Sequence, residues 1–230
     1  MSLTLFYTIV GFGLAGWSVI ANDSIQTLGT YMASKMKWFK WYTLAGVASI
    51  AMIITITYGW YVNNGDISYG RLTQIPYQKV YWYHAVAPGI LLLLTRKGIP
   101  VSTTFLVLSA FASTVVLEKM LLKSMVGYGV AAIFAYACWF IIAKFINEKK
   151  DHIENETQRK FWRNIKWGTS ALLWSTWLMH DVANIAVYLP RKLDGWLLVV
   201  VLAYFTILLF YLFKTKGGSI QDIVIHKTGT

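Results

Sequence analysis

The chain has 230 residues, of which 57% are hydrophobic and only 13% are charged. Several apolar runs approach or exceed the roughly 18 residues that indicate a bilayer span, which excludes a soluble globular fold. The net charge of +11 would point to nucleic acid in a soluble protein, but here it is attributed to Lys and Arg in cytoplasmic loops. We therefore expect an all-α, multi-pass membrane protein without a nucleic-acid partner. The single Cys138 predicts neither a disulfide nor a Cys metal cluster.

The first apolar segment runs from Leu3 to about Ser34 and contains a polar stretch at residues 21–30. One helix of that length would measure about 48 Å, against a hydrocarbon core of about 30 Å. Because Asn22 and Asp23 resemble a helix start, we expect two half-helices that meet there. An ionisable residue at this depth is usually functional. The alternative is that the span ends at Ile20 and Asp23 only caps an interfacial helix.

The middle of the chain predicts a hairpin between ordinary spans. Two short apolar arms, Val80–Thr95 and Val101–Leu117, flank a Gly/Pro-containing tip. Arms this short favour a re-entrant hairpin, and two short full spans are the alternative. A polar loop at residues 62–79 precedes the first arm. Three further spans are expected, each with few charges: Trp41–Tyr61, Ser124–Ala143 and Trp196–Phe213.

A charged connector at residues 144–166 is the clearest boundary in the sequence. It predicts a first transmembrane repeat at 1–143 and a partial second repeat at 167–230. The second repeat opens with Trp167–Pro190, a span interrupted by His180 and the four residues that follow it.

The distribution of basic residues predicts the topology. Placing the N-terminus outside and the connector inside puts about twice as many Lys and Arg residues inside as outside. In this orientation the two interrupted segments run in opposite directions, and Asp23 and Asp181 each lie roughly 15–18 Å from the next basic turn. Broken helices of opposite direction with matching polar interruptions indicate an inverted-repeat transporter in the cell membrane, and not an enzyme.

The polar residues of these breaks suit the binding of ions. Asp23 and Asp181 suit a hard cation such as Na⁺, and exposed helix-start amides attract an anion. Pro100-Val101-Ser102-Thr103-Thr104 adds hydroxyl donors for an oxyanion, although an ordinary capped turn would have the same residues. The sequence therefore predicts symport of an anion with a cation.

These motifs resemble the inorganic phosphate transporters of the PiT type. Ala21-Asn22-Asp23, with Gly29-Thr30 and Ser34-Lys35 downstream, is similar to the first copy of that family's signature. Gly98-Ile99-Pro100-Val101-Ser102-Thr103-Thr104 resembles its hairpin, and Asp181-Val182-Ala183-Asn184 resembles the second copy. The motifs occur in the family's order.

The resemblance implies uptake of inorganic phosphate by alternating access, coupled to Na⁺ or, in some members, to H⁺, by a homodimer without a resident cofactor. It assigns phosphate contacts to one set of side chains: Asn22, Gln26, Ser102, Thr103, Thr104 and Asn184. It assigns Na⁺ to Asp23 and Asp181. Gln26 replaces an Asn of the signature and Phe105 replaces the hairpin His. His180 replaces another Asn, and its imidazole would suit proton coupling.

A second hairpin at the spacing of the first would fall beyond Thr230, so we expect a truncated second repeat. Three alternatives to phosphate transport remain at this point. The same scaffold would suit sulfate or another oxyanion. A haem protein would use His84 and His180 as ligands. A membrane binding or assembly protein would bind without transporting.

Overall fold

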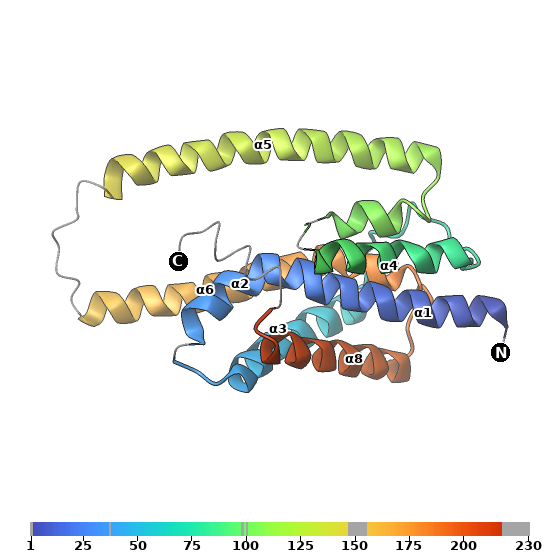
Figure 1. Ribbon diagram of the computed structural model, residues 1–230, viewed down its shortest axis with the longest axis horizontal. Helices are drawn as coiled ribbons and strands as arrows, with labels where there is room; N and C mark the ends of the chain where they lie inside the picture. The colour runs from blue at the N-terminus through green and yellow to red at the C-terminus, as the bar shows by residue number, and fades with distance from the viewer. Residues whose placement is uncertain (1, 37, 98, 100, 147–155, 218–230) are drawn as a thin grey trace. The chain divides into compact units, whose positions relative to one another are not determined.

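The computed structural model describes residues 2–36, 38–97, 99, 101–146 and 156–217, which form helices and turns without a β-strand (Figure 1). The tip residues Gly98 and Pro100 and the connector residues 147–155 lie outside the described part. The chain divides into two compact units, Met1–Phe111 with Thr169–Thr230, and Ala112–Gly168. These units differ from the two transmembrane repeats that the sequence predicted, and the division into repeats stays a prediction.

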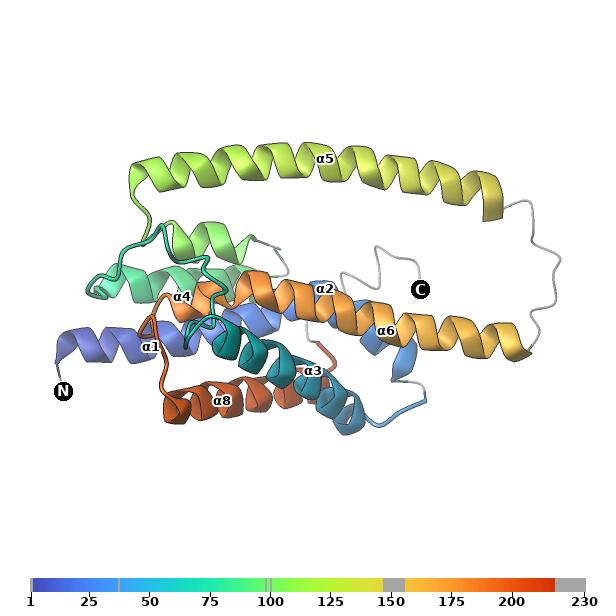
Figure 2. The same cartoon turned by 180° about the vertical axis from the view of Figure 1, so that it is seen from behind.

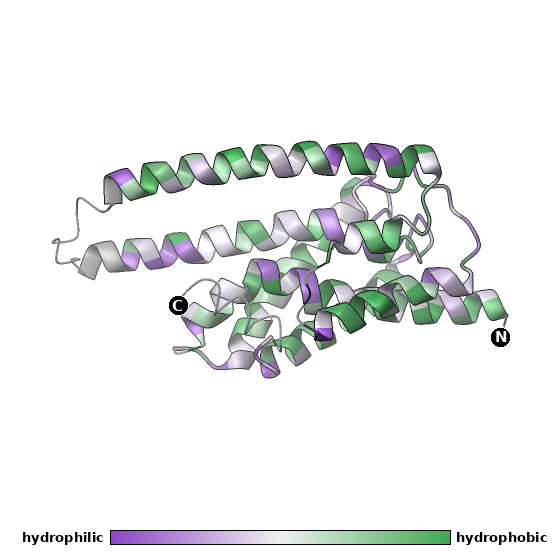
Figure 3. Cartoon of the chain, turned by 45° about the horizontal axis from the view of Figure 1, so that its top comes forward, coloured by the Kyte–Doolittle hydropathy of each residue, from purple (hydrophilic) through white to green (hydrophobic). Residues whose placement is uncertain are grey.

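Four helices are long and apolar enough to cross a membrane, judged by length and composition among the residues described. They are Leu3–Lys35, Trp41–Val62, Thr114–Lys144 and Gly195–Lys214. Apolar residues predominate along them (Figure 3). The predicted span Trp167–Pro190 is not in this group, because its helix, α6 (Glu156–Asp181), carries polar residues along much of its length.

The first unit is built from two pairs of adjacent helices. The helix α1 (Leu3–Ser18) lies along α4 (Trp82–Arg96), and α3 (Trp41–Val62) lies along α8 (Gly195–Lys214) (Figures 1 and 2). The bounds of α3 and α8 confirm two of the predicted plain spans to within a residue. Gly16 allows the close approach of α8, since a Cβ there would lie 2.6 Å from the ring of Tyr204.

The polar interruption of the first segment is a π-helical turn and not a gap. α1 leads into the π-helix η1 (Val19–Asp23), which continues as α2 (Ser24–Lys35). The expectation of two half-helices with an exposed start was therefore wrong, because the Ser24 amide donates to the Val19 carbonyl and the winding continues. A π-turn holds one residue more than an α-turn and is frequent at functional sites.

The interruption of the second segment is present where the sequence predicted it. α6 ends at Asp181, Val182 forms a turn, and the short helix α7 (Ala183–Ala186) follows. The Val182 amide still donates to the Leu178 carbonyl at 3.0 Å, so the chain bends without releasing that hydrogen bond.

The first predicted hairpin arm matches α4, but the second was wrong. A π-helix, η2 (Thr104–Leu108), is followed by a turn, and α5 (Thr114–Ile146) then runs as one helix through the position of the next predicted span. Two local features explain the turn. Gln78 Nε2 donates to the Phe111 carbonyl at 3.0 Å, and Ser113 stands at the favourable position before α5.

The predicted polar loop at residues 62–79 folds back against the helices. Asp66 organises it by accepting from the Ser68 amide at 2.7 Å and the Gly70 amide at 3.0 Å. Ser68 is fully buried, and Tyr69 Oη donates to the Thr55 carbonyl of α3. Thr55 lies about two turns before the end of α3, so the loop reaches roughly 10 Å back along the helix.

Candidate functional site

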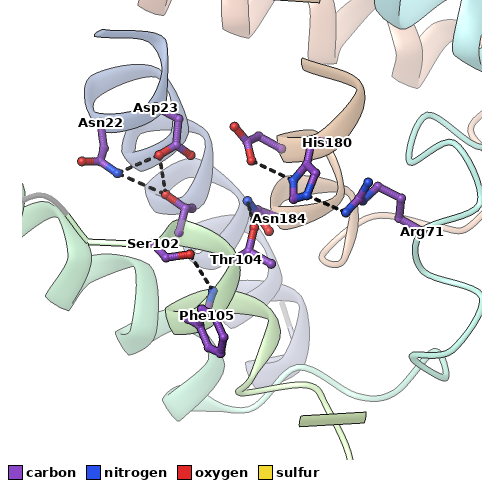
Figure 4. A network of polar contacts seen from close by, with 10 residues as sticks. Asn22, Asp23, Arg71, Ser102, Thr104, Phe105, His180 and Asn184 are labelled. Atoms are coloured by element: carbon purple, nitrogen blue, oxygen red, sulfur yellow. Dashed lines mark hydrogen bonds and ion pairs between the residues drawn. The ribbon is translucent and has the colours of Figure 1, made fainter. Parts of the chain in front are cut away.

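The first half of the candidate site surrounds Asp23, which is only 3% exposed. Its Oδ1 accepts from Asn22 Nδ2 at 2.7 Å and from Thr103 Oγ1 at 2.9 Å. Figure 4 shows Asn22 directed at Asp23. Asn22 Nδ2 also donates to the Val101 carbonyl at 2.9 Å. The π-turn is thereby joined to the Ser102-Thr103-Thr104 stretch, about 80 residues away in the chain.

Two hydrogen bonds involve the turn of α4 that contains Pro88. Pro88 lacks an amide hydrogen, so the His84 carbonyl one turn earlier loses its usual donor. Tyr188 Oη, from the segment after α7, donates to that carbonyl at 2.6 Å. Ser18 Oγ, at the end of α1, donates to the Pro88 carbonyl at 3.0 Å and joins α1 to α4 just before η1.

The second half of the site contains His180, Asp181 and Asn184. Asp181 is buried, with its side chain 6% exposed, and its Oδ1 lies 3.3 Å from His180 Nδ1. The Ser102-Thr103-Thr104 stretch reaches this half as well, since Asn184 Nδ2 donates to Thr104 Oγ1 at 3.3 Å. Two adjacent threonines therefore contact different halves of the site. Thr103 hydrogen-bonds to Asp23 in the first half, and Thr104 accepts from Asn184 in the second.

The two halves form one polar cluster, because the adjacent residues Thr103 and Thr104 each hydrogen-bond to one of them. We call this set the carboxylate cluster: Asn22, Asp23, Thr103, Thr104, His180, Asp181 and Asn184. All seven are residues that the sequence predicted for the site. Figure 4 shows that the π-turn, the hairpin stretch and the end of α6 each contribute to it.

Two predicted site residues lie outside the cluster. Gln26 is exposed on α2, and no hydrogen bond in the described part of the chain connects it to the cluster. The resemblance assigned Gln26 a phosphate contact, and that assignment stays a prediction. Ser102 is adjacent to the cluster, yet its Oγ accepts from the Phe105 amide at 3.4 Å.

Three oxygen atoms of the cluster are buried without a hydrogen-bond partner in the described structure: Asn22 Oδ1, Asp23 Oδ2 and Asn184 Oδ1. Buried polar atoms are normally paired, and leaving one unpaired costs about 1–3 kcal/mol. Carboxylate and amide oxygens are the ligands that hard cations take. The chemistry of these atoms therefore fits a cation such as Na⁺.

Sequence reasoning missed Arg71, which the folded-back loop brings to His180. The distance from Arg71 Nη2 to His180 Nε2 is 2.7 Å. Because arginine only donates, Nε2 must accept, so the neutral ring carries its hydrogen on Nδ1, which then donates to Asp181. Burial lowers the pKa of Arg71, and the charge of Asp181 opposes this effect. A loop arginine carries no periodic signal, and it had been counted only among the outer basic residues.

His84 is buried among aromatic side chains. Its Nδ1 accepts from the Tyr81 amide at 2.9 Å. The imidazole stacks on Phe111 with the ring centroids 4.0 Å apart. These contacts favour a packing role for His84 over the haem ligation that the sequence left open.

Comparison of the chain with protein-family models, curated proteins and solved structures finds no match. The described structure by itself defines a helical protein with four helices apolar enough to cross a membrane. It also contains a polar cluster that includes two buried carboxyl groups, Asp23 and Asp181.

Proposed function

We propose that the chain transports inorganic phosphate across a membrane together with Na⁺, by alternating access on an inverted-repeat scaffold with a re-entrant hairpin. One observation carries the proposal. Segments around residues 22, 103 and 181, which are remote in the sequence and hold the phosphate-transporter-like motifs, meet in one buried cluster. Ionisable residues are rarely kept in a membrane protein's interior unless they serve an ion path.

The cation would bind at the unpaired oxygens. Asp23 offers Oδ2, since its Oδ1 is already used by Asn22 and Thr103. The Asn22 and Asn184 amide oxygens add neutral ligands from both halves. A cation held this way would draw the two halves together and compensate the repulsion between Asp23 and Asp181.

The anion would use the donors of the same region. The Ser102 and Thr104 hydroxyls lie on the hairpin beside the second half, where Thr104 Oγ1 already contacts Asn184. Phosphate at neutral pH still carries a hydrogen that a carboxylate can accept, and sulfate does not. Because bound Na⁺ would offset the carboxylate charge, the anion would enter after or with the cation, which is the basis of coupling.

The direct test is uptake of labelled phosphate by proteoliposomes, with and without an inward Na⁺ gradient. We expect Na⁺-dependent uptake by the wild type and its loss in Asp23→Asn. The side-chain oxygen of the asparagine in this variant can still accept the hydrogen bond from Thr103, but it lacks the negative charge that would hold the cation. Glu118→Gln on α5 is the matched control, because it neutralises an exposed acid outside the cluster and should leave uptake unchanged.

Other outcomes would assign the cluster differently. Equal inhibition of uptake by sulfate would make the protein a general oxyanion permease. Uptake driven by a pH gradient alone would make H⁺ the coupling ion. Binding of phosphate without flux would indicate a membrane binding protein. Absence of both binding and uptake would refute the proposal.

A further inference from the structure

We propose that Arg71 is the residue that contacts the anion and selects oxyanions at the carboxylate cluster, with His180 holding its guanidinium in place. The proposal rests on the proposed function and adds to it a cationic side chain that reaches the cluster through a hydrogen bond to His180. Phosphate is the probe ligand, and the class that Arg71 would recognise is tetrahedral oxyanions.

The first support is the path of the loop. Residues 66–72 leave the end of α3 and return along it, with Ile67, Ser68 and Leu72 buried and Tyr69 hydrogen-bonded to the Thr55 carbonyl. Non-helical backbone at the depth of a membrane helix is tolerated only where it is buried in protein or lines a polar cavity. The loop backbone around Arg71 is therefore held in place by its buried neighbours, while the Arg71 side chain itself is exposed.

The second support is the geometry of Arg71. One amino group, Nη2, is engaged by His180 Nε2 at 2.7 Å. A guanidinium has five N–H donors in a planar fork, so donors remain for a second partner. His180 is 50% exposed while Asp181 behind it is 6% exposed, which makes the Arg71–His180 contact the solvent-accessible edge of the cluster.

The third support is the distribution of charge. Figure 4 shows Asp23 and Arg71 on opposite sides of His180. Two of the three unpaired oxygens, those of Asn22 and Asp23, lie on the Asp23 side, and the guanidinium lies on the other. A phosphate bound at the guanidinium would therefore be separated from the Asp23 carboxyl group by His180. Arginine binds such anions through two parallel hydrogen bonds, which lysine cannot reproduce.

The experiment is equilibrium binding of labelled orthophosphate to the purified full chain in lipid nanodiscs, in the presence of Na⁺. We expect Arg71→Gln to weaken phosphate binding at least about tenfold and Arg71→Lys to weaken it by a smaller factor. Na⁺-dependent thermal stabilisation, measured without phosphate, should stay at the wild-type level in both, because the cation ligands are untouched. A residue with a merely structural role would change both readouts.

Arg163→Gln is the matched control. Arg163 is an exposed arginine on α6, 18 residues before Asp181 on the same helix. It should keep wild-type phosphate affinity.

Wild-type phosphate affinity in Arg71→Gln, or in Arg71→Lys if the glutamine variant does not fold, would overturn the role of Arg71 and leave the transport proposal standing. A wild-type protein that binds no phosphate would overturn both. If both variants lose Na⁺-dependent stabilisation as well as phosphate binding, the role of Arg71 is also overturned. Arg71 would then support the fold and would not bind the anion.

Discussion

The two oxygens of the buried Asp23 carboxyl group are unequally paired. Two donors, Asn22 and Thr103, converge on Oδ1, while Oδ2 has no partner in the part of the chain that the structure describes. The convergence orients the carboxyl group and leaves its second oxygen free for a ligand. An interior carboxylate with such one-sided pairing is better suited to binding a cation than to stabilising the fold.

Thr103→Val tests this orientation, because valine keeps the shape of threonine and removes the donor to Asp23. A hydrogen bond to a charged group contributes about 1.5–3 kcal/mol, so we expect a lower unfolding midpoint and weaker Na⁺-dependent stabilisation. Thr206→Val removes only a local bond to the Leu202 carbonyl within α8 and serves as the control. Equal behaviour of the two variants in thermal unfolding with and without Na⁺ would contradict the role of Thr103.

At the scale of elements, the position of the site depends on irregular backbone. The π-turn η1 presents Asn22 and Asp23 to the hairpin, and the folded-back loop brings Arg71 to His180. Both features require close packing against a regular helix. The loop is fixed to α3 at Gly59, where a Cβ would overlap the ring of Tyr69.

Gly59→Ala should therefore displace Tyr69 and the loop that carries Arg71. We expect weaker phosphate binding and a lower unfolding midpoint, because the added methyl group occupies the space of the ring. Gly46→Ala on the same helix is the control, since nothing lies within 4 Å of its Cβ position. Phosphate titrations and thermal unfolding of both variants measure the effect, and unchanged binding in Gly59→Ala would show that the loop position does not matter to the site.

At the scale of the whole molecule, the four apolar helices and the asymmetry of basic residues predict how the chain crosses a membrane. The predicted orientation places the N-terminus outside and the polar C-terminal tail inside. The loop between α7 and α8 then lies outside. Homodimer formation stays a prediction that mass measurement of the purified protein would check.

Cysteine labelling tests this orientation after Cys138, the only cysteine, has been replaced by alanine. Lys192→Cys should react with a membrane-impermeant maleimide in intact cells, because its loop faces outside. Lys216→Cys should react only after permeabilisation. Both positions are exposed, so accessibility within the protein does not separate them. The reverse pattern would invert the predicted topology.

Much of the fold and of the site followed from local sequence. Apolar runs bounded by polar residues predicted α3, α4 and α8 nearly to the residue, because length and hydropathy govern such helices. Asp23 and Asp181 were conspicuous because ionisable groups inside apolar segments are costly. The resemblance to the phosphate transporters pointed to the other polar residues of the carboxylate cluster. The second hairpin arm was predicted too long, since an apolar run continues through the turn at residues 109–113.

The sequence by itself determined the helical class, the positions of the interruptions and the residues worth testing, because each of these depends on near neighbours in the chain. Only the tertiary structure decided that the first interruption is a π-turn, that Gln26 lies outside the cluster and that Arg71 reaches it. Helical phase and the return of a loop depend on contacts between remote segments, such as Tyr69 with Thr55 and Thr103 with Asp23. No local pattern encodes those contacts.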